Sequence, residues 1–188
     1  HTRLQGDWSS DVCSSDLITK EGQVKDTHIL VLNPGLSIQD WHQIIDNKQH
    51  RSEHNGVTFY FEKSKAWYAN KNESFYKEKG EVGWCLILAK PQPGSNHKTY
   101  SEMDAMELAE GYTGGGINDL VVGVCSYYLN SGKNLFPFKN NQAVLSMSST
   151  DARSCRVYIN FDDARLNFGE WRDVRHKNCL IGRGVLRK

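Results

Sequence analysis

The last third of the chain carries the clearest alternation of hydrophobic and polar positions. Over residues 157–168 every second residue is apolar up to an acidic pair, and the alternation resumes after it: Val157, Ile159, Phe161, Leu166 and Phe168. Successive side chains of a strand point to opposite faces of a sheet. The pattern therefore predicts two antiparallel strands joined by a turn at Asp162-Asp163. A closing apolar strand, "CLIGRGVLRK", is predicted at residues 179–188.

Continuous apolar runs predict further strands in the first half of the chain. His28–Leu32 ("HILVL") stops at the turn signal Asn33-Pro34-Gly35, and Val57–Phe61 is rich in β-branched and aromatic side chains. Val82–Ala89 ("VGWCLILA") is the strongest single strand because its apolar run is the longest. Residues 64–81 are polar with scattered aromatic side chains, which favours an exposed hairpin or loop.

Two segments begin with residues that stabilise the first turn of a helix. Ser37 can cap a short helix that has Asp40 in its first turn. The apolar side chains of this helix are Ile38, Trp41, Ile44 and Ile45. Thr99 and Glu102 have the spacing of a capping box, which predicts a second helix that continues to Leu108.

A third, longer helix follows the glycine-rich run "GYTGGG" at residues 111–116. Its apolar side chains recur at intervals of three and four residues: Ile117, Leu120, Val121, Val124, Tyr128 and Leu129. This spacing predicts one apolar face, and Gly132 occupies the position of a C-terminal cap. Glycines before a helix can cradle a phosphate. The Lys and Ser/Thr of a phosphate loop are missing here, however, so a flexible connector is favoured.

In this order the elements predict an α+β fold rather than repeated βαβ units. We expect residues 83–188 to form one domain with two helices and short antiparallel strands. Residues 18–82 are then a smaller α/β appendage before it.

Residues 1–17 fit none of these patterns. In "DWSSDVCSSDL", residues 7–17, the apolar Trp8, Val12 and Leu17 match neither helical nor strand spacing, and Ser and Asp favour caps and turns. The stretch resembles one reading frame of a common sequencing adapter. We therefore expect residues 1–17 to be non-native and disordered. We also expect the true N-terminus to lie outside this sequence, together with any signal peptide.

Composition narrows the classes of partner. The chain has 23 Lys and Arg against 22 Asp and Glu, a balance that argues against nucleic-acid binding. No apolar run approaches the roughly 18 residues of a membrane-spanning helix. Aromatic side chains make up 11% of the chain, and they suit both cores and binding surfaces.

The cysteines offer little evidence of chemistry. Beyond residue 17 they lie at positions 85, 125, 155 and 179, and no two form a Cys-x-x-Cys pair. Zinc binding is therefore disfavoured and buried thiols are the default interpretation, although a Cys155–Cys179 disulfide stays open. A nucleophilic Cys125 or Cys155 would need a histidine partner, and the sequence alone gives no geometry for one.

Three stretches carry a resemblance to a known family: "KPQPGSNHKTYSE" (residues 90–102), "YYLNSGKNLF" (residues 127–136) and the closing Trp171…Ile181-Gly182…Arg187-Lys188. From about Trp84 to Lys188 the chain resembles C-type-lectin-like domains of bacterial proteins, many of them from metagenomes. It is similar to the target proteins of diversity-generating retroelements. The resemblance implies a compact scaffold that displays variable side chains on a late loop. The matching positions are Asn167, Glu170, Trp171, Arg172, Asp173, Arg175, His176 and Asn178.

The residues themselves favour exposure of this loop. Most positions from Gly169 to Asn178 are charged, amide-bearing or histidine, and they lie between two apolar strands. Loops on a rigid scaffold are where binding function concentrates. Within the loop, the charged residues favour a surface role and Trp171 favours a core role. Calcium-dependent sugar binding is disfavoured because Arg172 replaces a ligating amide of the lectin pattern and no Glu-Pro-Asn or Gln-Pro-Asp triplet precedes it.

The sequence thus predicts a non-enzymatic module that binds an unknown protein or glycan through residues 167–178, with no cofactor, metal, nucleic acid or membrane span. Two alternatives stay open. One is an enzyme, either a Cys/His hydrolase or an oxidase of the formylglycine-generating type. The other is a structural domain without a site. We expect a bacterial protein of the cytoplasm or the cell surface.

Overall fold

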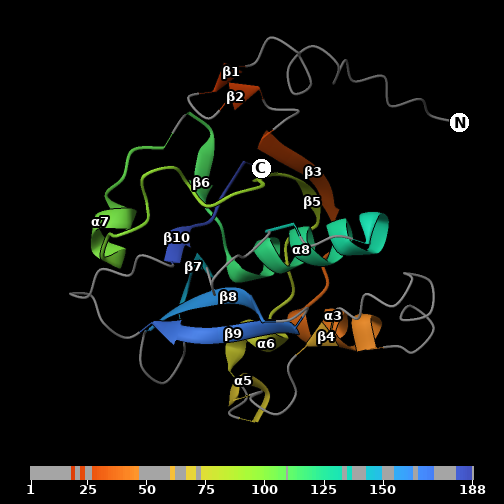
Figure 1. Ribbon diagram of the computed structural model, residues 1–188. Coiled ribbons are helices and arrows are strands. Elements are labelled where there is room, and N and C mark those ends of the chain that lie inside the picture. Colours follow the sequence, from red (N-terminus) through yellow and green to blue (C-terminus); the bar gives the residue numbers. More distant parts are fainter. Residues whose placement is uncertain are drawn as a thin grey trace, which may run out of the picture.

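The computed structural model describes residues 18–19, 22–23, 27–46, 60–61, 67–70, 73–108, 110–132, 135–136, 143–149, 155–162, 165–171 and 181–187. Over these ranges the chain forms two main β-sheets with helices packed between and beside them (Figure 1). The predicted α+β class is therefore confirmed. The predicted non-native segment 1–17 lies outside the described residues.

The large sheet has five strands in the order β10-β7-β8-β9-β4. They are β4 (Tyr60–Phe61), β7 (Ala143–Ser149), β8 (Arg156–Asp162), β9 (Arg165–Trp171) and β10 (Ile181–Arg183). The three central strands pair antiparallel, whereas β10 and β4 pair parallel to their neighbours. β8 and β9 are the strand pair that the alternation predicts. Ile159 lies opposite Phe168 because this register keeps the apolar positions of both strands on one face.

The small sheet has four antiparallel strands in the order β3-β5-β11-β6. They are β3 (His28–Asn33), β5 (Gly83–Leu88), β6 (Tyr112–Gly114) and β11 (Val185–Arg187). β3 and β5 confirm two predicted strands. The glycine-rich run is more ordered than a flexible connector: Gly114 ends β6 and Gly116 is the N-cap of the following helix. A separate two-stranded pair, β1 (Ile18–Thr19) and β2 (Gly22–Gln23), precedes β3.

The closing strand is divided between the two sheets, so the prediction of one continuous strand is wrong. Ile181–Arg183 pairs with β7 in the large sheet, and Val185–Arg187 inserts between β5 and β6 in the small sheet. The change of sheet takes place at the buried Gly184, whose carbonyl oxygen accepts a hydrogen bond from the backbone N–H of Gly115 at 2.9 Å.

The longest helix, α8 (Ile117–Ser131), lies between the two sheets (Figure 1). Its buried residues include Val122, Gly123 and Cys125 as well as every predicted apolar position except the partly buried Leu129, so the prediction of a single apolar face is wrong. A helix in a central layer must be apolar on several sides. Gly123 allows the small sheet to approach closely, because a Cβ at this position would lie 2.5 Å from Cδ1 of Ile87.

Local capping residues set the helix ends. In α3 (Ile38–Asp46), the Asp40 carboxylate accepts hydrogen bonds from the Ser37 N–H and hydroxyl, at 2.9 and 2.7 Å. In α7 (Tyr100–Asp104), Thr99 and Glu102 form the predicted capping box, but the helix ends at Asp104 rather than at Leu108. Gly132 caps α8 in the left-handed conformation at φ 66°, as predicted.

Residues 64–81 differ most from expectation. Where they are described, they form two short helices, α5 (Trp67–Asn70) and α6 (Ser74–Lys77), rather than an exposed hairpin or loop. The aromatic side chains of Tyr68 and Phe75 are buried and pack on Phe168 of β9, with ring centroids 4.9 and 6.4 Å away. These aromatic residues belong to the core.

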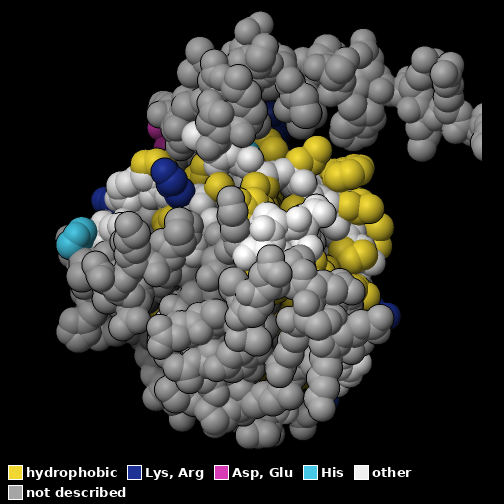
Figure 2. All heavy atoms as spheres, turned by 45° about the vertical axis from the view of Figure 1, so that its right-hand side comes forward, with side chains coloured by type: hydrophobic (Ala, Val, Ile, Leu, Met, Phe, Trp, Pro, Cys, Tyr) yellow, Lys and Arg dark blue, Asp and Glu magenta, His cyan; other side chains and the backbone are white. Residues whose placement is uncertain are grey.

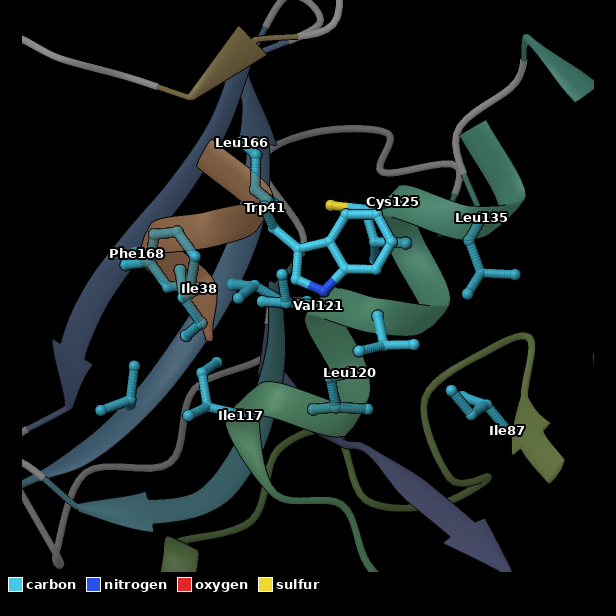
Figure 3. Packing of buried hydrophobic residues seen from close by; sticks show 14 of the residues in the cluster. Ile38, Trp41, Ile87, Ile117, Leu120, Val121, Cys125, Leu135, Leu166 and Phe168 are labelled. Carbon is cyan, nitrogen blue, oxygen red and sulfur yellow. The ribbon is translucent and has the colours of Figure 1, made fainter. Parts of the chain in front are cut away.

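One hydrophobic core joins the two parts of the chain. Figure 3 shows Trp41 of α3 pointing toward α8, where Val121 and Cys125 lie. The same core includes Val31 of β3 and Leu166 of β9. Described residues before position 83 therefore share a core with described residues after it.

Candidate binding surface

The large sheet has two faces of different character. Val157 and Ile159 of β8 point toward α8 and the core, and so do Leu166 and Phe168 of β9. The opposite face, which we call the outer face, carries three cross-strand pairs from β8 and β9: Arg156–Trp171, Tyr158–Gly169 and Asn160–Asn167. Polar and aromatic side chains thus gather on one side of the sheet.

Trp171 anchors one end of the outer face. Its side chain is only 7% exposed and packs on the fully buried Met103 of α7. Tyr100 of α7 meets the Trp171 ring edge-on, with centroids 6.4 Å apart at 81°, the arrangement that aromatic quadrupoles favour. The core role favoured for Trp171 is confirmed, and this contact places α7 over the end of β9.

Arg156 ties α7 to β8. Its Nη2 donates to Oδ2 of Asp104 at 2.8 Å, and its guanidinium carbon lies 5.6 Å from the centroid of the Tyr100 ring. The planar guanidinium can serve both contacts at once. Because Arg156 and Asp104 are both partly buried, this bridge is shielded more than a surface ion pair.

Arg183 of β10 holds α7 from the other side. It is 5% exposed, and its Nη1 donates to the carbonyl oxygens of Met103 and Met106 at 2.7 and 3.2 Å. The Met103 carbonyl lies in the last turn of α7, where free acceptors accumulate, and the Met106 carbonyl lies two residues beyond the helix end. Burial lowers the pKa of Arg183, while the nearby Asp104 carboxylate opposes that shift. Helix α7 is therefore fixed to β8, β9 and β10.

Tyr158 lies across Gly169 beside this anchor. A Cβ at Gly169 would lie 2.1 Å from Cζ of Tyr158, so only glycine leaves room for the ring. The ring is half-buried, and burial raises the pKa of Tyr158. The next cross-strand pair, Asn160 and Asn167, is partly exposed. An aromatic ring thus stands beside two amide side chains on a rigid sheet.

The predicted site residues divide into three groups. Asn167 and Trp171 lie on the outer face, whereas Glu170 lies on the opposite face, half-buried opposite Val157. The remaining five predicted residues lie outside the described ranges: Arg172, Asp173, Arg175, His176 and Asn178. The strands at the two ends of this segment, β9 and β10, are separated in the sheet by β8 and β7.

Several residues of this surface were not predicted as site residues from the sequence. Arg156, Tyr158 and Asn160 are the positions that alternate with the apolar residues of β8, so the strand pattern already placed them together on one face. Tyr100 and Arg183 carry no such signal. They reach the surface only through the position of α7 and β10.

The described thiols are poorly placed for nucleophilic chemistry. Cys85, Cys125 and Cys155 are all buried. Burial raises the pKa of Cys125, which keeps its thiol protonated and weakly nucleophilic. Cys85 Sγ donates to Oδ1 of Asp119 at 3.8 Å, within a buried polar network of the core. Cys179 lies outside the described residues.

The described residues offer neither a metal-binding cluster nor a membrane-spanning helix. No group of three or more His, Cys, Asp or Glu side chains that could hold a metal ion occurs in that part of the chain. None of the described helices is long and apolar enough to cross a membrane.

Comparison with known proteins gives no relative: no family model, no curated protein and no solved structure matches this chain.

Proposed function

We propose that this protein is a non-enzymatic ligand-binding module that binds its ligand on the outer face of the large sheet, next to the segment 172–178. One observation carries the proposal. The half-buried Tyr158 ring lies beside the partly exposed pair Asn160 and Asn167, on the paired strands β8 and β9 to which α7 is fixed. Binding sites typically combine apolar or aromatic surface with a few fixed polar groups.

The chemistry of these side chains indicates a polar, uncharged ligand surface. An amide side chain offers both donors and an acceptor, so it can match a sugar hydroxyl or a peptide group equally well. An aromatic ring adds apolar contact area at a low cost in side-chain entropy. The ligand class is therefore a glycan or the polar surface of a protein.

The anchoring of α7 supports this function. Contacts from Arg156, Trp171 and Arg183 fix the helix to three strands. A surface that is rigid before binding loses less conformational freedom when the ligand binds. The charged residues of the segment 172–178 would then extend the contact from a fixed starting point at Trp171.

We also propose that residues 83–188 form the lectin-like scaffold that the sequence resembles, with residues 167–178 as its variable region. The order of strands and helices supports this, and so does the antiparallel pairing of β5 with β11. That pairing brings both ends of residues 83–188 together, as is common for a compact domain.

Glycan and protein arrays probed with the full chain would test the function. For a ligand so identified, Asn160→Ala and Asn167→Ala should each weaken binding by about tenfold, which corresponds to one good hydrogen bond. Arg172→Ala and Arg175→Ala test the adjoining segment. Asn130→Ala, at an exposed position of α8, is the matched control and should leave binding unchanged. A ligand that binds all four site variants as tightly as the wild type would place the site elsewhere, and a chain that binds nothing on either array would favour the structural alternative.

A further inference from the structure

A second surface lies on the small sheet and is apolar, in contrast to the polar and aromatic outer face of the large sheet. Four large apolar side chains are exposed there: Leu30 by 47%, Leu32 by 49%, Trp84 by 51% and Val82 by 72%. Figure 2 shows hydrophobic side chains gathered on the side of the molecule where β3 and β5 lie. Leu32 and Trp84 are directly opposite each other in the strand pairing, so the patch crosses from β3 to β5.

β3 is the edge of this sheet. Within the described ranges it pairs only with β5, in a regular register of six residue pairs. Edge strands are usually protected from further pairing by charged residues, proline or a bulge. β3, with the sequence HILVLN, contains no proline and no Lys, Arg, Asp or Glu, and its register with β5 shows no shift.

We propose that β3 pairs antiparallel with β3 of a second copy of this chain, with Val31 on the twofold axis. A twofold contact needs a strand that complements itself. The residues Leu30-Val31-Leu32 read the same in both directions, so Leu30 of each copy faces Leu32 of the other. All four leucines then lie on one face of a continuous sheet.

Alternation of the side chains selects this register. Leu30 and Leu32 point away from α8, whereas Ile29 and Val31 point toward it. A shift by one residue would place an exposed leucine of one copy on the same face as the inward Val31 of the other. The uncharged leucine pair also favours a second copy over a partner with a charged strand.

The area involved indicates a weak dimer. At roughly 100 Å² for a whole leucine side chain, Leu30 and Leu32 together offer on the order of 100 Å² per copy, since each is about half exposed. That is far below the roughly 800 Å² per partner of a standard interface. Pairing therefore depends on the backbone hydrogen bonds of the two strands, and we expect dimers whose population rises with concentration.

Disulfide trapping tests the register directly. Residues that face each other in an antiparallel pair are close enough for a disulfide. Under mild oxidation, a mixture of full-length Leu30→Cys and Leu32→Cys chains should cross-link severalfold faster than either variant alone. The wild-type chain, oxidised in the same way, measures the background from native cysteines. Equal rates for the mixture and the single variants, or no cross-linking above background, would overturn the proposal.

Sedimentation equilibrium tests the contact without cross-links. The wild type should show a dimer at high concentration, and Leu30→Lys should weaken it at least about tenfold. Val82→Lys is the matched control, because Val82 belongs to the same apolar patch but not to β3. It should leave the dimer intact. Loss of the dimer in both variants would indicate packing of the two sheets face to face, and a wild type that stays monomeric at every concentration would exclude the contact. Either result overturns the proposal.

Discussion

Helix α8 lies between the two sheets, but the faces of the sheets that point away from α8 differ in how far they are covered. On the large sheet, α7 covers Trp171 and leaves it 7% exposed; on the small sheet, Trp84 is 51% exposed. Both tryptophans lie on strands, on faces turned away from α8. The difference shows that strand patterning decides which way a side chain points, while a neighbouring segment decides whether it is buried.

This difference also separates the two proposed roles. The large sheet presents polar and aromatic groups on a frame held by buried contacts, which suits recognition of a ligand. The small sheet leaves an apolar edge without the usual protective charges, which suits pairing with a copy of itself.

Removing each tryptophan should give the largest contrast. Trp171→Ala should lower the free energy of unfolding by about 3–5 kcal/mol, because it deletes a buried aromatic side chain. Trp84→Ala should cost about 1 kcal/mol at most, since its side chain is half exposed. Urea denaturation followed by circular dichroism measures both. Similar costs would contradict the difference in burial between the two faces.

Removing Asp104 tests the anchoring of α7. Asp104→Ala should destabilise the fold by about 1–3 kcal/mol, because Arg156 would lose its ion-pair partner and the buried Arg183 would lose a nearby opposite charge. Glu107→Ala, at an exposed position just after α7, is the control and should change stability by less than about 0.5 kcal/mol. The same denaturation assay applies. A neutral Asp104→Ala would mean that α7 is held by its apolar contacts alone.

A pair of strand glycines compares the two sheets directly. Gly169→Ala should cost about 1–2 kcal/mol, because the new methyl group would displace the Tyr158 ring. Gly83→Ala in β5 should be close to neutral, since nothing lies within 4 Å of the added atom. Adding Tyr158→Ala to Gly169→Ala should make the two costs non-additive. Strict additivity in thermal or urea denaturation would contradict the contact between the ring and Gly169.

The smallest effect concerns the helix that follows β3. Hydrogen bonds from the Ser37 hydroxyl and N–H lower the pKa of Asp40. A lowered pKa in the folded state means that this group stabilises the fold above its ordinary value of about 3.9, and that the contribution disappears as the pH falls through the lowered value. Asp40→Ala should therefore cost about 0.5–1 kcal/mol at pH 6, and the difference from wild type should vanish in strong acid. A difference that is the same at pH 6 and in strong acid would show that the carboxylate charge is not involved.

Local features of the fold could be predicted from the sequence. The strands β3, β5, β8 and β9 follow from apolar runs or strict alternation, and the caps at Ser37, Thr99 and Gly132 follow from residue type. Each of these signals lies within a few residues of the element that it predicts. Interactions between residues that are close in sequence are sufficient to determine these strands and caps.

Features that depend on distant partners could not be predicted. Tyr68 and Phe75 are buried because Phe168 reaches them from β9, and nothing near residues 64–81 indicates that contact. The change of sheet at Gly184 depends on which strands lie on either side of it. For the binding surface, the alternation in β8 placed Tyr158 and Asn160 on one face. The capping box predicted helix α7, but its position over that face depends on distant contacts that no local pattern indicates.

The insertion of β11 between β5 and β6 has a consequence for how the protein is made. A ribosome releases β3, β5 and β6 long before it releases residues 185–187, yet β6 joins the sheet only through β11. The small sheet of the nascent chain is therefore incomplete until β11 has been synthesised, at about 5–20 residues per second. During this time the apolar strand β5 lacks one of its two neighbours. Contacts between distant segments also slow the final step, because the loop between them must close first. Residues 181–187 thus add strands to both sheets, and until they are synthesised the incomplete small sheet is exposed to aggregation.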